Sequence, residues 1–245
     1  MSEQTLSIDT TFNFYSDSGG KDPDSHSPTL KKYHKLLWSK ALPNGEIFKL
    51  SDTDSNSYLT YKFGREEIAL SSDSISNSYR DKKSLSNILK DLTSEVEKFR
   101  NIGSTIGGYI LFPGKKIDGK MTINGSRGFN RKIADRFDLT LECVRLHYLG
   151  KPNPLENVLN QNSSFFKLFE NFVGYVDFFL LQDLVNPDYE LVYFLQPIKQ
   201  VFESSPLPES KVEYLQYMQS SNSFTIKRNE RIKQWATDNQ SIAYI

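Results

Sequence analysis

The spacing of hydrophobic residues predicts several helices, and the pattern is most regular at residues 84–101. Apolar side chains recur there every three or four positions, as on one face of an amphipathic helix. Ser84 is a suitable N-cap and Gly103 a suitable terminator. We expect this helix to dock on a sheet through Leu92 and its apolar neighbours. Further helical patterns cover residues 29–40, 155–160, 165–172, 175–185, 209–219 and 226–236.

Alternation of apolar and polar residues predicts short strands elsewhere. After the turn signal Pro-Asn-Gly at residues 43–45, two alternating segments at residues 46–50 and 57–63 can pair as strands. Residues 71–83 are mostly polar, which indicates a surface loop. The other candidate strands are residues 67–70, 188–195 and, as the alternative to a helix, 175–181.

The stretch at residues 107–148 is the centre of the predicted fold. An apolar run at residues 109–112 predicts a buried strand, and a turn-rich basic loop follows it. A long amphipathic helix comes next, with an apolar stripe from Ile133 to Tyr148. A helix N-terminus attracts anions, so a basic loop that leads into a cationic helix entrance favours an anion-facing surface.

These elements predict an α+β fold with a small, mostly antiparallel sheet packed by several amphipathic helices. Hydrophobic residues make up 38% of the chain and aromatic residues 13%, which is enough to build a dense core. Residues 1–28 are polar and contain glycine and proline, so we expect an extended N-terminal arm. Residues 29–245 contain no sharp break in composition and are expected to form a single domain.

Charge and cysteine content limit the partners and the cellular compartment that we expect. Lys+Arg and Asp+Glu both number 30, so only local clusters can favour a nucleic-acid or membrane partner. The lone cysteine, Cys143, has no partner for an intrachain disulfide, which favours a reducing compartment. The start of the chain lacks a signal-peptide pattern, and the apolar run at residues 172–185 is short and interrupted. We therefore expect a cytoplasmic protein with no membrane partner.

The first candidate site is the basic cluster around residues 115–136. Its expected ligand is nucleic acid or a phosphorylated small molecule, because arginine forks contact phosphate oxygens in pairs. The alternative is an ordinary solvated helix end. On one continuous helix Arg136 would lie about 140° from Arg131, so Arg127 and Arg131 are the more consistent pair. The candidate ligand-binding residues are Lys116, Arg127, Asn130, Arg131 and Arg136.

The second candidate site is the predicted helix at residues 29–40. Trp38 beside Lys40 suits stacking on a ring or base, and His34 is the candidate catalytic base because its pKa is near neutral. The alternative is that Trp38 and His34 are core residues of this helix. The sequence has no zinc-type spacing of Cys and His and no EF-hand pattern, so we predict no metal site and no particular cofactor.

Residues 21–45 and 123–148, together with residues 174–185, resemble a bacterial family of proteins of unknown function. The resemblance covers most of the chain and implies a bacterial, cytoplasmic protein. It implies no reaction, cofactor or site residue.

Three functions therefore stay open. The first is binding of nucleic acid or another phosphate-bearing ligand at the basic cluster, with or without a reaction on it. The second is a protein–protein interaction module without catalysis, formed by the aromatic C-terminal half. The third is a small-molecule hydrolase that uses His34. The sequence does not indicate an oligomeric state.

Overall fold

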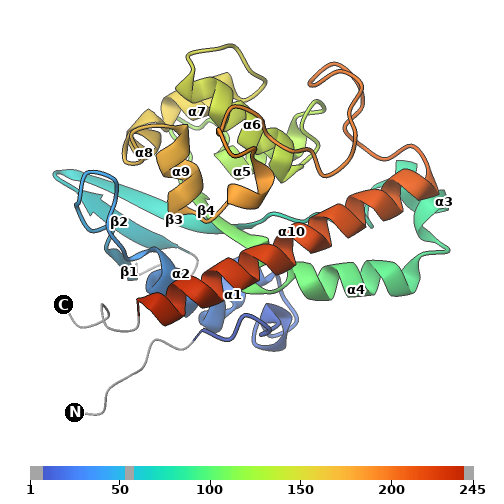
Figure 1. Cartoon of the computed structure of the whole chain (residues 1–245), viewed down its shortest axis with the longest axis horizontal. Helices are drawn as coiled ribbons and strands as arrows, with labels where there is room; N and C mark the ends of the chain where they lie inside the picture. The colour runs from blue at the N-terminus through green and yellow to red at the C-terminus, as the bar shows by residue number, and fades with distance from the viewer. Residues whose placement is uncertain (1–7, 53–57, 240–245) are drawn as a thin grey trace.

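The computed structural model describes residues 8–52 and 58–239 and has the predicted α+β architecture (Figure 1). One antiparallel sheet has the strand order β1-β2-β3-β4. The strands are β1 (Leu50–Asp52), β2 (Leu59–Phe63), β3 (Glu66–Ser74) and β4 (Tyr109–Pro113). The predicted strand at residues 109–112 is confirmed by β4, whose five residues are all buried. Ser57, where we expected the second strand to begin, lies outside the described residues.

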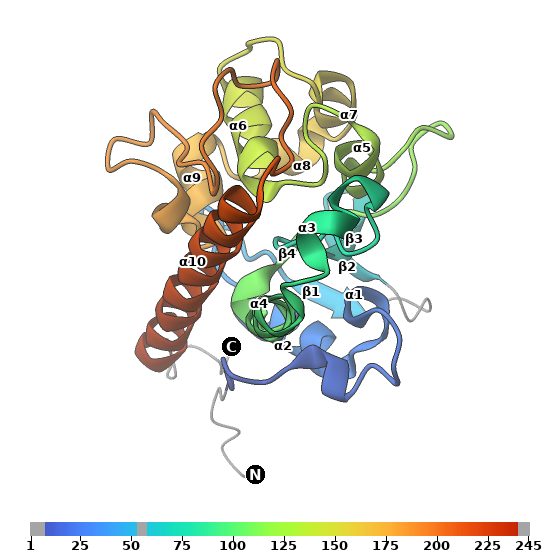
Figure 2. The ribbon, with the colours of Figure 1, turned by 90° about the vertical axis from the view of Figure 1, so that its right-hand side faces the viewer.

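Helices surround this sheet on both faces and along one side. In chain order they are η1 (Phe14–Ser16), α1 (Pro23–His26), α2 (Pro28–Trp38), η2 (Lys83–Leu85), α3 (Ser86–Leu89), α4 (Thr93–Gly103), η3 (Ile106–Gly108), α5 (Ile123–Phe129), α6 (Phe137–Tyr148), α7 (Glu156–Gln161), α8 (Ser163–Lys167), α9 (Phe172–Phe178), η4 (Gln182–Leu184) and α10 (Lys211–Asp238). Helices α5 to α9 lie above the sheet in Figures 1 and 2, and α1 and α2 lie below it. Helix α10 runs diagonally past the sheet with α4 beside it.

Strand β3 extends further than its apolar residues predict. Strand β2 pairs with residues 66–70, and residues 70–74 pair with β4. Ser72 and Asp73 are buried within the strand, although we predicted residues 71–83 to be a surface loop. That prediction was wrong because both polar side chains have buried partners. Successive strand residues point to opposite faces, so Ser72 contacts α2 through His34 and Asp73 contacts α5 through Arg127.

The predicted helix at residues 84–101 is divided into η2, α3 and α4, with a break at residues 90–92. Leu92 is buried, as expected, but it lies at the N-cap of α4. Helix α4 packs chiefly against α10 rather than against the sheet. The two predicted C-terminal helices, at residues 209–219 and 226–236, form the single 28-residue helix α10.

A close approach between α10 and the chain before β4 explains the glycine at position 107. A Cβ atom added to Gly107 would lie 2.5 Å from the backbone oxygen of Thr225 in α10. The Gly107 N–H instead donates to Asn229 Oδ1 at 2.7 Å. Helix α10 is long, but no helix in residues 8–52 or 58–239 combines the length and apolar character needed to cross a bilayer.

Two further predictions required correction. The long helix expected before Tyr148 consists of two helices, α5 and α6, separated by residues 130–136. Residues 188–195, expected to form a strand, are irregular apart from an isolated bridge between Val185 and Val192. The aromatic segments at residues 165–172 and 175–185 are mainly helical, in α8, α9 and η4, with irregular connections. Residues 8–28 of the expected arm contain η1 and α1, and Phe14 is fully buried in the core.

Candidate ligand-binding cleft

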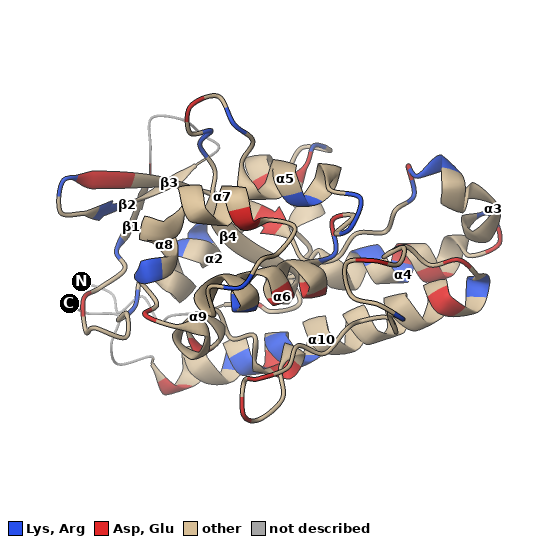
Figure 3. Ribbon diagram, turned by 90° about the horizontal axis from the view of Figure 1, so that it is seen from above, with Lys and Arg blue, Asp and Glu red and all other residues tan. Residues whose placement is uncertain are grey.

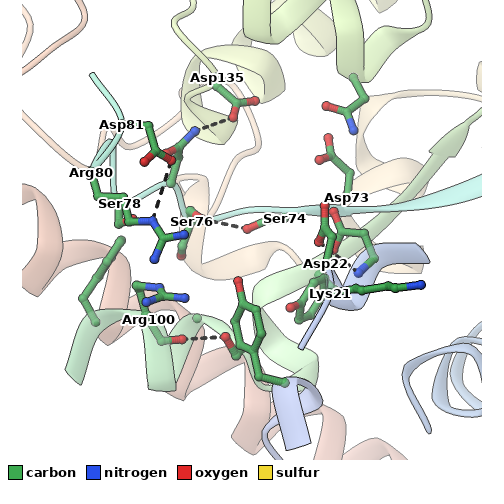
Figure 4. A pocket seen from close by; sticks show the side chains of 18 of the residues that line it. Lys21, Asp22, Asp73, Ser74, Ser76, Ser78, Arg80, Asp81, Arg100 and Asp135 are labelled. Atoms are coloured by element: carbon green, nitrogen blue, oxygen red, sulfur yellow. Dashed lines mark hydrogen bonds and ion pairs between the residues drawn. The ribbon is translucent and has the colours of Figure 1, made fainter. Parts of the chain in front are cut away.

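A polar cleft of about 630 Å³ opens where β3 and β4 meet α1, α4 and α5. We call it the acid cleft because five aspartates line it. Three cationic side chains, Lys21, Arg80 and Arg100, line it as well. Figure 4 shows the labelled charged residues around one space, and they come from segments that are far apart in the sequence. The five aspartates are Asp22, Asp24, Asp73, Asp81 and Asp135.

Buried Arg127 fixes the inner wall of the acid cleft. Its Nη1 group donates to Asp73 Oδ2 at 2.5 Å and to the Ser74 carbonyl at 3.0 Å. Its Nη2 group donates to the Asp135 carbonyl at 2.8 Å, and its Nε group donates to Thr140 Oγ1 at 3.2 Å. A guanidinium group that is bonded on all sides holds two acids in fixed positions, so Arg127 positions the cleft.

Asp73 is buried with Arg127 beside it, and burial and the charge of Arg127 have opposite effects on the pKa of its carboxyl group. Burial raises the pKa of the Asp73 carboxyl to about 6, although the positive charge of Arg127 acts to lower it. An acid with a pKa in this range can both accept and release a proton near neutral pH. Asp73 therefore has a protonation state that suits proton transfer.

Asp24, in α1, has a carboxyl oxygen without a hydrogen-bond partner in the described part of the chain. Its Oδ1 atom is buried and accepts no hydrogen bond from the described residues. Burial, followed by the negative charges of Asp73 and Asp22, raises the pKa of Asp24 well above its usual value. A buried acceptor without a donor destabilises the fold unless something else supplies the bond. Asp24 is one of the residues that line the acid cleft, so its carboxyl group is at the border between the cleft and the interior.

Strained backbone shapes the wall beside Asp135. Ala134 and Asp135 have φ values of 46° and 62°, and Tyr79 across the wall has a φ of 51°. The Tyr79 hydroxyl donates to the Ala134 carbonyl at 2.9 Å, and Asn77 Nδ2 donates to Asp135 Oδ2 at 2.5 Å. Non-glycine residues seldom adopt left-handed backbone, and such residues cluster at functional sites.

The cationic residues lie nearer the solvent. Lys21 and Arg80 are exposed and Arg100 is half-buried. Figure 4 shows the guanidinium groups of Arg80 and Arg100 directed into the cleft. Arg80 Nε lies 3.6 Å from Asp81 Oδ2, and the guanidinium of Arg100 lies 5.3 Å from the centre of the Tyr15 ring. The acid cleft thus has an acidic interior and a cationic rim.

The basic cluster expected from the sequence does not form one surface. Arg127 and Arg136 have no exposed surface, so neither can contact a ligand from solvent, and this part of the hypothesis needs correction. Arg136 forms an ion pair with Asp138 and donates to the Pro206 carbonyl at 2.9 Å. Lys116 and Arg131 are exposed, and Asn130 Nδ2 donates to the Pro154 carbonyl at 3.0 Å.

The second expected site is part of the core. Trp38 is fully buried, and Lys40 Nζ lies 5.0 Å from its ring centre. The same ammonium lies 4.7 Å from the Phe178 ring and 5.1 Å from the Trp235 ring. Burial, aided by the charge of Arg228, lowers the pKa of Lys40 to about 7. These contacts enclose Lys40 and Trp38 within the protein's own side chains.

Both ring nitrogens of His34 have partners. Trp38 Nε1 can only donate, and it lies 3.0 Å from His34 Nδ1, so Nδ1 must be the acceptor. The proton is then on Nε2, which donates to Ser72 Oγ at 2.9 Å. Burial lowers the pKa of His34 to about 3. This tautomer has no nitrogen available to accept a proton, so the geometry does not support the hydrolase alternative.

Comparison with known proteins adds one finding. The sequence model of a family described as of unknown function matches residues 8–232. The chain belongs to DUF6994. No curated protein and no solved structure matches this DUF6994 chain. The match confirms the expected membership of a family of unknown function, and it assigns no activity.

The acid cleft of this DUF6994 protein was not predicted from the sequence because its residues come from distant segments of the chain. Asp73 lay in the predicted surface loop, and Asp24 lay in the expected N-terminal arm. Within the described ranges, no three His, Cys, Asp or Glu side chains are placed to share a metal ion. One signal was available: the run of serines and aspartate at residues 71–74 directly continues an apolar strand.

Proposed function

We propose that the acid cleft binds a small molecule with a phosphate group at one end and hydroxyl groups at the other, such as a sugar phosphate or a nucleotide. The proposal keeps the phosphate-bearing ligand expected from the sequence. It moves the binding site from Arg127, Arg131 and Arg136 to the acid cleft. The observation that carries it is Asp24, a lining residue of the cleft whose buried Oδ1 atom has no hydrogen-bond donor among the described residues.

The two ends of the cleft suit the two ends of such a ligand. Lys21, Arg80 and Arg100 provide positive charge at the rim, and among the described residues neither Lys21 nor Arg100 has a carboxylate partner. A phosphate group placed there would gain charge-assisted hydrogen bonds. In the interior, Asp24 would accept a bond from a ligand hydroxyl, and Asp73 lies beside it with a pKa of about 6.

The cleft also has the chemistry for proton transfer. Asp24, whose pKa burial raises well above normal, retains a proton more readily than an ordinary aspartate. Asp73 is held by Arg127 and exchanges protons near pH 6. Two neighbouring acids, one protonated and one ionised, can act as acid and base toward one substrate. A reaction on the bound ligand would therefore use Asp24 and Asp73 rather than His34.

Calorimetric titration with a hexose phosphate, AMP, inorganic phosphate and the parent hexose tests this proposal. We expect a phosphorylated compound to bind more tightly than phosphate or the hexose alone. Arg100→Ala should weaken that binding about tenfold or more, since a hydrogen bond to a charged group contributes about 1.5–3 kcal/mol. Asp24→Asn should weaken it to a similar extent by changing the group that meets the ligand hydroxyl.

Two control variants test whether a loss of binding is specific to the cleft. Lys98→Ala removes an exposed cation from the same helix as Arg100, and Asp188→Asn alters an exposed acid far from the cleft lining. Both should bind like the wild type. The proposal fails if no phosphorylated compound binds, if Arg100→Ala binds as well as Lys98→Ala, or if a polyamine such as spermidine is the only ligand.

A further inference from the structure

Phe129, the last residue of α5, is the most exposed large hydrophobic residue in the described part of the chain, at 80%. It borders a groove of about 350 Å³ between the loop before α5 and helix α7. The other groove residues are of both kinds: the polar Lys120, Ser126, Asn130, Asn157 and Gln161 and the apolar Met121, Pro154, Leu155 and Val158. An exposed aromatic ring beside amide groups is typical of surfaces that hold a flat, polar ring system.

The groove has a fixed position relative to the body of the protein. Asn130 Nδ2 donates to the Pro154 carbonyl at 3.0 Å, which ties the end of α5 to the chain before α7. Asn130 Oδ1 accepts from the Lys132 backbone N–H at 2.9 Å. Phe129 is therefore presented from a backbone that is already ordered, and binding would not have to order it.

Lys120 lines this groove, and further cations lie next to its lining residues along the chain. Five exposed cations lie within residues 115–132, and the only acid in this range is Asp118. In the part of the chain that the structure describes, none of the five forms an ion pair, whereas Arg127 pairs inside the protein. Figure 3 shows basic segments in the loop that projects beside α5. The five cations are Lys115, Lys116, Lys120, Arg131 and Lys132.

We propose that this groove binds a single-stranded nucleic acid. One base stacks on Phe129, Asn157 and Gln161 contact its edge, and the surrounding cations contact the backbone phosphates. Base stacking on an exposed aromatic ring requires an unpaired base, which favours a single strand over a duplex. An acidic peptide would use the same cations but would have no ring to place on Phe129.

This site is separate from the acid cleft. Asn124 of α5 lines the acid cleft, whereas Ser126 and Phe129 of the same helix line the groove. The two clefts share no lining residue. The nucleic-acid proposal therefore does not depend on the proposed small ligand, and variants of one site can serve as controls for the other.

Fluorescence anisotropy with labelled 12-nucleotide oligo(dT) and oligo(U), measured at several salt concentrations, tests the proposal. We expect the wild type to bind a single strand more tightly than a duplex of equal length. Phe129→Ala should weaken binding about fivefold to a hundredfold through lost stacking. Arg131→Ala/Lys132→Ala should reduce the slope of log affinity against log salt by about 0.7 for each phosphate contact removed.

Controls separate the groove from general surface charge. Tyr193→Ala removes an exposed aromatic ring elsewhere, and Lys227→Ala removes an exposed cation on α10. Arg100→Ala tests whether the oligonucleotide enters the acid cleft instead. All three should bind oligonucleotides like the wild type. Because Phe129 is exposed, its variant should also keep the wild-type melting temperature, which checks that folding is intact.

Several outcomes would overturn the proposal. They are the absence of oligonucleotide binding at low salt, equal affinity of wild type and Phe129→Ala, and loss of binding in Arg100→Ala rather than at the groove. Binding of polyglutamate as tight as that of the oligonucleotide, and unaffected by Phe129→Ala, would identify an acidic-protein surface instead. Weaker binding of Phe129→Ala together with a reduced salt slope in the arginine–lysine variant would support it.

Discussion

Two groups of buried and half-buried charged residues, on either side of β3, have opposite surpluses of charge. On one side Asp24, Asp73 and Asp135 share a single buried cation, Arg127. On the other side the residues near Trp38 are cationic or neutral bases: His34, Lys40 and Arg228. Burial raises the pKa of Asp24 and Asp73 in the first group. It lowers the pKa of His34, Lys40 and Arg228 to about 3, 7 and 9 in the second.

The cationic group is matched by the protein itself. Arg228 donates to the backbone carbonyls of Gly107, Tyr109 and Phe179 at 2.7–3.2 Å. Lys40 lies over three aromatic rings, whose faces attract a cation. These partners come from α9, α10 and the start of β4, so the cationic group joins distant segments of the fold.

The acidic group is matched only in part, because Asp24 Oδ1 has no donor among the described residues. The two groups therefore differ in role: the cationic group, whose bonds are complete, is structural, and the acidic group, whose bonds are incomplete, is suited to binding. A buried charge surrounded by protein partners stabilises one arrangement of the chain, whereas a buried acceptor at a cleft suits a ligand. The pKa shifts alone do not make this distinction, since they are large in both groups.

The largest expected effect contrasts the two buried arginines. Arg127→Met should lower the free energy of unfolding by about 3–5 kcal/mol, since it leaves buried carboxylates without a counter-charge. Adding Asp73→Asn should restore part of this loss, because the amide needs no cation. Arg228→Met should also destabilise the protein by several kcal/mol, but Asp73→Asn should not restore it. Urea unfolding of the single and double variants at pH 7 measures the coupling.

A double variant less stable than Arg127→Met alone would contradict this pairing of Arg127 with Asp73, because the two residues would then act independently. Rescue of Arg228→Met by Asp73→Asn would contradict the separation of the two groups. That second result would mean that the acidic and cationic groups form one electrostatic network across β3.

A smaller effect is expected from Asp24→Asn. The folded pKa of Asp24 lies above its unfolded value, so its ionisation opposes folding, and this contribution to stability is lost as the pH rises. Relative to the wild type, the asparagine variant should therefore gain stability between pH 4 and pH 8, by about 1–2 kcal/mol. Exposed Asp188→Asn is the matched control, and denaturant unfolding across this pH range is the measurement. A variant less stable than wild type at pH 8 would indicate a structural role for Asp24.

The smallest effect concerns Lys40→Met. The folded pKa of Lys40 is about 7 and its ordinary value is 10.5, so ionisation opposes folding fully below pH 7 and ceases to do so as the pH approaches 10.5. The methionine variant should gain about 1 kcal/mol relative to wild type at pH 6, because the three rings offset part of the burial cost. That gain should vanish near pH 10. Lower stability than wild type at pH 6 would show that the rings more than compensate for burial.

Local pattern was enough to predict much of the fold. The α+β class, the buried strand β4 and the helix at α2 follow from apolar spacing. Spacing also identified the buried face that contains Leu92 but not the break before α4. The division of the predicted long helix into α5 and α6 depends on the positive-φ turn at Ala134 and Asp135, which no glycine marks.

The acid cleft was beyond local pattern. Arg127 was expected on the surface because an isolated arginine favours water, yet Asp73, 54 positions earlier, makes its burial possible. Asp73 was itself assigned to a loop, because an aspartate in a strand has low propensity unless a partner is known. The burial of Arg127 and the burial of Asp73 depend on each other, and a single sequence does not reveal that these two residues are in contact.

The adjacency of Ser72 and Asp73 on β3 also bears on how accurately the sheet assembles. A slip of one residue in the pairing of β3 with β4 would turn Asp73 toward His34 and Trp38, and Ser72 toward Arg127. The slipped chain would bury a carboxylate against an indole and leave a guanidinium without its acid. Many strands are kept in register by apolar residues alone. Here two neighbouring polar residues also fix the register, because each has its buried partner on only one face of the sheet. The misaligned sheet is therefore far less stable than the correct one.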